Sequence, residues 1–75
     1  MTTNLKDILT IDVPKWQTFE KMPLQELKEW ERKLAPFYAK RSQINEEYGF
    51  MAWQKAMRCW YVFRCIKEIE EKSQN

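Results

Sequence analysis

The side chains that could do chemistry are two cysteines and eleven carboxylates, because this chain of 75 residues contains no histidine. Histidine is the commonest general base and metal ligand, and a structural zinc site usually needs four nitrogen or sulfur ligands. The single glycine also excludes the phosphate-binding loops, which need several glycines at fixed spacing. We therefore predict no metal and no cofactor.

Cys59 and Cys65 lie six residues apart. On one helix their Cα atoms are separated by about 9 Å along the axis, which exceeds the ~7 Å limit for a disulfide. We expect two free thiols that act as small apolar side chains. A reactive thiol is the alternative, with Cys65 the more exposed of the two.

Four glutamates form two adjacent pairs, Glu46 with Glu47 and Glu70 with Glu71. Adjacent side chains on a helix point about 100° apart, so neither pair converges on a substrate. No serine or threonine has a recognisable base partner. The sequence therefore predicts a protein that is not an enzyme.

Residues 1–22 are expected to form a packing segment made of short elements. Helical spacing after a possible cap at residues 2–4 predicts a short helix near 4–10. Residues 11–14 should be an extended link, because the residue before a proline avoids the α region. One or two helical turns follow over 15–22. Their two aromatic rings are expected to pack onto the main body: Trp16 and Phe19.

A heptad seam over residues 23–48 predicts a long helix that begins at Pro23, where a missing N–H costs nothing. Pro36 lies inside the seam, and proline disrupts a helix interior, so we expect a kink near 32–36. A break into two helices there is the alternative. The seam positions recur at intervals of three and four: Leu27, Trp30, Leu34, Phe37, Arg41, Ile44 and Tyr48.

Arg41 is the charged member of this seam. Burying it unpaired would cost several kcal/mol, so we expect its side chain to extend to solvent or to pair with Glu46 or Glu47. A polar residue at one seam position can fix the register of packing. Direct contact with a partner is the alternative role.

Gly49 can end that helix in the left-handed conformation, and residues 50–72 then form a second helix. Its apolar side chains cover an arc of roughly 180°, wider than the ~100° stripe of an ordinary surface helix. We expect the 23–48 helix to cover one side, and either the N-terminal segment or a second copy of the chain to cover the other. These residues make up the arc: Ala52, Trp53, Ala56, Cys59, Trp60, Val62, Phe63, Ile66 and Ile69.

The predicted fold is thus an all-α single domain over 1–75, a three- to four-helix small bundle. An antiparallel helical hairpin, about 23–48 and 50–72, carries the N-terminal helical segment packed on it, and 73–75 form a frayed tail. One helix continuing through Gly49 and pairing with another molecule is the competing topology.

The net charge of +2 conceals a sorted pattern. Folding the hairpin at Gly49 brings cations of both helices to its middle and two groups of glutamates to the end nearest the termini. We call the cations the basic belt, and interpret it as a contact surface for an acidic protein or nucleic acid; an ordinary solvated face is the alternative. The basic belt consists of Arg32, Lys33, Lys40, Lys55, Arg58 and Arg64.

The eleven aromatic residues divide into core and surface groups. Tyr48 and Phe50 lie at the hairpin tip, and Tyr61 lies near Arg58 and Arg64, where tyrosine beside arginine is typical of interface hot spots. The candidate partner-binding surface is therefore the basic belt, Arg41, and these three rings. The rings expected in the core are Trp30, Phe37, Trp53, Trp60 and Phe63.

These patterns predict a small protein that acts by binding. The first hypothesis is a regulator, inhibitor or assembly factor that docks a macromolecular protein partner, a role common among accessory proteins of phages and mobile elements. The alternative is a nucleic-acid-binding accessory protein that uses the basic belt, and the third hypothesis is a homodimer.

No leader and no apolar run of about 20 residues is present. We expect no membrane contact and a cytoplasmic location, in the host cell if the protein is viral.

Overall fold

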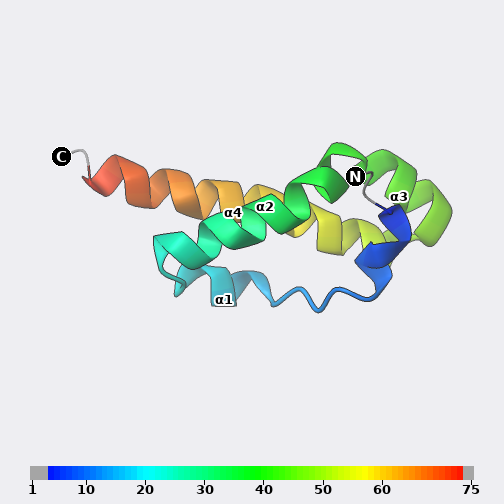
Figure 1. Ribbon diagram of the computed structural model, residues 1–75, viewed down its shortest axis with the longest axis horizontal. Helices are drawn as coiled ribbons and strands as arrows, with labels where there is room; N and C mark the ends of the chain where they lie inside the picture. The colour runs from blue at the N-terminus through cyan, green and yellow to red at the C-terminus, as the bar shows by residue number, and fades with distance from the viewer. Residues whose placement is uncertain (1–3, 74–75) are drawn as a thin grey trace.

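The computed structural model describes residues 4–73, which fold into a small bundle of helices with no strand among them (Figure 1). The order is η1 (Leu5–Leu9), α1 (Trp16–Glu20), α2 (Leu24–Ala39), α3 (Arg41–Tyr48) and α4 (Phe50–Ser73). Helices α2 and α4 run antiparallel, and α3 turns the chain between them (Figure 1). The predicted all-α hairpin with a packed N-terminal segment is confirmed; residues 74–75 of the expected tail lie outside the described residues.

The N-terminal segment follows the predicted order of elements. Element η1 is a 3₁₀ helix whose cap is Asn4, the side chain of which accepts a hydrogen bond of 3.1 Å from the Lys6 N–H. The extended link then carries the chain along the bundle to α1 (Figure 1). In α1, Phe19 is fully buried as expected, but Trp16 keeps 48% of its surface exposed.

Helix α2 continues through Pro36 to Ala39, so the alternative of a break at the proline is wrong, and the chain breaks at Lys40 instead. A bend of α2 near 32–36 stays a prediction. Leu34 and Phe37 on either side of the proline are buried in the core, and this packing holds the helix together across the missing hydrogen bond. The long helix predicted over 23–48 is therefore two helices.

Arg41 stabilises the break between α2 and α3. Its guanidinium donates a hydrogen bond of 2.9 Å to the carbonyl of Tyr38 and lies 4.4 Å from the centre of the Tyr38 ring. This carbonyl belongs to the last turn of α2, where helix carbonyls lack partners within the helix. The expected pairing with Glu46 or Glu47 is wrong: Arg41 caps the preceding helix.

Gly49 ends α3 and begins the return of the chain. Its φ of 93° and ψ of 180° lie in a region that only glycine enters readily. The competing topology, one helix continuing through this position, is thereby excluded. The predicted reversal of the chain is confirmed. The ψ of Gly49 differs, however, from that of the left-handed helical conformation that we expected.

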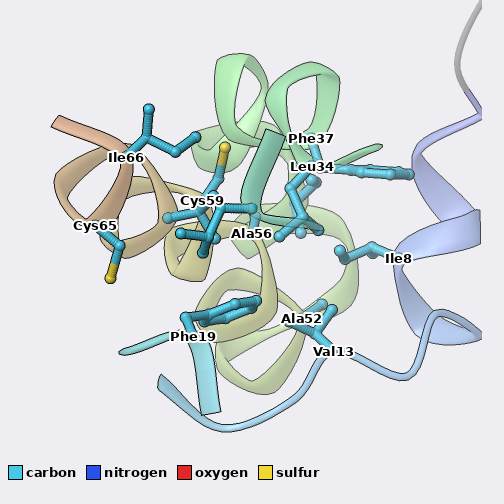
Figure 2. Packing of buried hydrophobic residues seen from close by; sticks show 13 residues of the cluster. Ile8, Val13, Phe19, Leu34, Phe37, Ala52, Ala56, Cys59, Cys65 and Ile66 are labelled. Carbon is cyan, nitrogen blue, oxygen red and sulfur yellow. The ribbon is translucent and has the colours of Figure 1, made fainter. Parts of the chain in front are cut away.

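The core lies between α4 and the elements on two sides of it. The α4 residues at its centre are small, as with Ala56 and Cys59, which allows neighbouring helices to approach closely. Figure 2 shows these two residues between Leu34 of α2 and Phe19 of α1. The buried residues are Ile8, Val13, Phe19, Leu27, Leu34, Phe37, Ile44, Ala52, Ala56, Cys59, Val62, Cys65 and Ile66.

Candidate functional site: an aromatic groove along the last helix

Lys55 of the basic belt binds the N-terminal segment. Its Nζ lies 3.3 Å from the carbonyl oxygen of Ile8, 3.4 Å from that of Leu9 and 3.0 Å from that of Ile11. An ammonium group has three N–H donors, so this one side chain can satisfy three carbonyls at the end of η1 and the start of the link. The cation thus holds the segment on α4.

Arg58 makes a second attachment of the same kind. Its guanidinium donates a hydrogen bond of 2.8 Å to the carbonyl of Val13, the link residue whose side chain is buried in the core. Lys55 and Arg58 are both half-buried, one turn apart on α4. Lys55 directs its ammonium group at three carbonyls of the N-terminal segment, and Arg58 directs one N–H at a fourth.

Tyr61 attaches α1 to the same helix. Its hydroxyl donates a hydrogen bond to the carboxylate of Glu20, and its ring contacts Trp16 edge-on with 5.5 Å between ring centres. The bond to Glu20, supported by desolvation of the hydroxyl, raises the pKa of Tyr61 to about 12. Tyr61 therefore has a structural contact in addition to any contact with a partner.

The remaining cations of the predicted surface are distributed over α2 and α4. Lys33 lies 5.0 Å from the centre of the Trp30 ring, while Arg32 and Lys40 are exposed. Arg64 is exposed, pairs with Glu68 at 3.3 Å and lies 5.9 Å from the centre of the Trp60 ring.

The two predicted tip aromatics differ in exposure. Tyr48 is half-buried and packs against the core cluster. Phe50 keeps 60% of its surface exposed, and its ring stacks on Trp53 with 5.5 Å between centres. Phe50 thus begins an exposed aromatic face on α4.

An open apolar groove lies along this face of α4 and against α1. Trp60, which was expected in the core, is 49% exposed. Trp60 and Trp53 lie at one edge of the wide apolar arc, and the elements packed on α4 leave that edge open. The groove is shallow and open to solvent, with a volume of about 500 Å³, and we call it the aromatic groove; its lining residues are Trp16, Trp53, Gln54, Met57, Arg58, Trp60 and Tyr61.

The sequence reasoning identified Arg58 and Tyr61 of this groove but missed its apolar walls. The signal was present in the spacing. Phe50, Trp53, Met57, Trp60 and Arg64 recur on α4 at intervals of three and four, which places them along one face of a helix. This second stripe lies beside the buried one.

Three cations line the aromatic groove and the hollow beside it, and two carboxylates contact their lining residues: Glu20 bonds to Tyr61 and Glu68 pairs with Arg64. A smaller hollow of about 260 Å³ shares Trp60 with the groove and is also lined by Arg64 and Lys67. The residues lining the two hollows include these two cations and Arg58, and they include no carboxylate. Another hollow contains Glu31 beside Glu70 and Glu71, together with Lys67, so glutamates of α2 and α4 meet there as the sequence predicted.

The two cysteines are free and belong to the core. Cys59 is fully buried and Cys65 is 8% exposed, the order that the sequence predicted. Burial, with a smaller contribution from the charge of Glu31, raises the pKa of Cys59 to about 12. Burial also raises the pKa of Cys65. Both thiols are thus protonated at neutral pH, the form that is a poor nucleophile.

Residues 4–73 contain no cluster of three or more histidine, cysteine or acidic side chains that could hold a metal ion. Within the same range, no helix is both long enough and apolar enough to span a lipid bilayer. No known protein family, curated protein or solved structure matches the chain.

Proposed function

We propose that this chain is a protein-binding module that docks a macromolecular partner in the aromatic groove. A single observation carries the proposal: Trp60 is half exposed and lines an apolar groove to which two helices contribute. A small protein rarely leaves clustered tryptophans open to water, and exposed apolar patches of this kind mark interaction sites. Tryptophan and tyrosine also dominate the energetics of protein interfaces.

Regulators, inhibitors and assembly factors act in this way, by binding alone. The sequence offers no histidine for acid–base chemistry, and both thiols are held in their protonated form by burial. A binding role agrees with a chain that exposes large aromatic rings to solvent.

Binding of nucleic acid by the basic belt has weaker support. Lys55 directs its ammonium group to carbonyls of the N-terminal segment, Arg58 donates one hydrogen bond to Val13, and Arg64 pairs with Glu68. A nucleic-acid surface needs several cations that are free to neutralise phosphates. The aromatic groove therefore supports a protein partner better than a phosphate backbone.

The test is capture from a lysate of the native cell with immobilised wild-type chain, a Trp60→Ser variant and a Lys28→Ser control. Lys28 is an exposed residue of α2 that lines neither of the two hollows on α4. We expect a discrete protein that is retained at about 150 mM salt after nuclease treatment, is lost with Trp60→Ser and is kept with Lys28→Ser. Equal retention by wild type and Trp60→Ser, or retention that nuclease abolishes, would refute the proposal.

A further inference from the structure

We infer that the occupant of the aromatic groove is an amphipathic helix whose apolar residues are flanked by acidic ones. This inference rests on the proposed function and specifies the class of partner. Three features of the groove carry it: the spacing of the side chains on α4, the shape formed with α1, and the sign of the surrounding charge.

The spacing favours a helical occupant. Phe50, Trp53, Met57, Trp60 and Arg64 repeat at intervals of three and four, the pattern that packs against a second helix as a seam. The stripe from Trp53 to Trp60 extends about 10 Å along the axis. That length matches two turns of a partner helix, which would present apolar side chains at positions i, i+3 or i+4, and i+7.

The shape also favours a helix that inserts large side chains. Trp16 of α1 and Tyr61 of α4 meet edge-on and form one wall, while Trp53, Met57 and Trp60 form the rest. A volume of about 500 Å³ accommodates several apolar side chains of an inserted ridge. No strand edge is present among residues 4–73, so pairing with an extended segment has no template in this part of the chain.

The cations beside the aromatic groove favour an occupant that carries acidic residues. Arg58, Arg64 and Lys67 line the two hollows on α4, and the lining residues include no carboxylate. Arg58 gives one hydrogen bond to the carbonyl of Val13, and Lys67 also lines the hollow that contains Glu31, Glu70 and Glu71. Arg64 does pair with Glu68, but an exposed pair of this kind is weak and can exchange for a partner's carboxylate. Acidic residues beside the apolar stripe of the partner would meet these cations on docking.

A second copy of the chain fits the aromatic groove less well. An isologous contact would place the same face of both copies together, and Arg58, near the centre of the stripe, would then lie near the Arg58 of the other copy. Like charges brought together in an interface oppose association. An acidic helix from a different protein meets no such repulsion.

The probe is a displayed library of random peptides of about 18 residues, or five helical turns, selected on immobilised wild-type chain and counter-selected on Trp60→Ser. We expect enrichment of peptides with apolar residues at helical spacing and net negative charge. A synthetic selected peptide should bind at least about tenfold more weakly to an Arg64→Glu, Lys67→Glu double variant, while the matched reversal Lys28→Glu should leave the affinity unchanged. Circular dichroism of both variants confirms that they are folded.

Four outcomes would overturn this inference. They are enrichment of proline-rich or basic peptides, a library with no enriched sequence, equal affinity of the charge-reversed variant, and sedimentation in which the wild-type chain self-associates through Trp60. The proposed function has a separate test. A lysate protein retained in a Trp60-dependent manner, together with any of these four outcomes, would uphold protein binding and reject the acidic helix.

Discussion

Lys55 Nζ lies 3.0 Å from the carbonyl oxygen of Ile11, a residue 44 positions earlier in the sequence. This hydrogen bond attaches the extended link to α4. The same ammonium reaches the carbonyls of Ile8 and Leu9. Beside it, Arg58 reaches Val13. These bonds hold the N-terminal segment in the place where Trp16 can form one wall of the aromatic groove.

Replacing Lys55 with methionine should loosen this attachment. The Lys55→Met variant keeps an unbranched apolar stem but leaves the carbonyls without their charged donor. Because hydrogen bonds to charged groups contribute about 1.5–3 kcal/mol, and Lys55 is only half-buried, we expect the free energy of unfolding to fall by about 1–2 kcal/mol. Chemical denaturation measures the loss, and hydrogen exchange should report faster exchange in residues 5–13. Lys67→Met, at an exposed position of the same helix, should change stability by less than about 0.5 kcal/mol; equal effects of the two variants would contradict the role of Lys55.

Tyr61 should titrate at unusually high pH. The bond to Glu20 raises the pKa of Tyr61 from 10.0 to about 12, so the folded chain holds this proton more tightly than the unfolded chain. The resulting stabilisation is complete below about pH 10 and is lost as pH rises toward 12. The ultraviolet spectrum of tyrosinate should show a step near pH 12 that Tyr61→Phe removes and Glu20→Ala moves to lower pH. The control Glu26→Ala, an exposed carboxylate of α2, should leave the step in place, and a step unaffected by Glu20→Ala would rule out this hydrogen bond.

Gly49→Ala should destabilise the hairpin through backbone conformation. A Cβ at this position would meet no atom within 4 Å, so steric contact with other residues contributes nothing. The φ of 93° with ψ of 180° is itself the cost for an L-residue, about 1–3 kcal/mol. Thermal or chemical denaturation measures it. A chemically synthesised chain with D-alanine at this position, for which positive φ is favourable, should retain the stability of the wild type; an equal loss with both residues would show that the backbone conformation is not responsible.

Cys59 should be unreactive while the chain is folded. Its pKa, raised from 9.0 to about 12 by burial, keeps the thiolate scarce at neutral pH. Because the folded chain holds the proton more tightly, the stabilisation is complete below about pH 9 and is lost as pH rises toward 12. A thiol reagent at pH 8 should modify Cys59 only at the rate of unfolding, and both cysteines at once in denaturant. The decline of stability between pH 9 and 12 should be smaller in Cys59→Ala. Rapid labelling of Cys59 in the native chain would disprove its burial.

The helices could be predicted from the sequence because they depend on local spacing and on residues with strong backbone preferences. The apolar repeat predicted helical structure over the residues of α2 and α3, although as one helix, and over those of α4, and Gly49 marked the reversal before α4. Pro36 shows the limit of such reasoning. Its local penalty is a few kcal/mol, and the burial of Leu34 and Phe37 on both sides outweighs it.

The candidate site was harder to predict because periodicity gives the direction of a side chain and not what covers it. Trp60 lies at the edge of the apolar arc, and only the placement of the N-terminal segment decides that this edge stays open. Lys55 is similar. On a helical wheel Lys55 falls between Val62 and Ile66, inside the apolar arc. A cation at such a position faces the chain itself, and this was the available signal that Lys55 bonds to the chain's own carbonyls rather than to a partner.

The most direct test of the central claim, that a partner docks in the aromatic groove, is site-specific photo-crosslinking with the partner captured from the lysate. A photoreactive amino acid replaces Met57, which lines the groove, or Lys28 on α2 as the matched control, and mass spectrometry identifies the products. The account predicts an efficient crosslink to the partner from position 57 and none from position 28. A crosslink from position 28, with none from position 57, would contradict it.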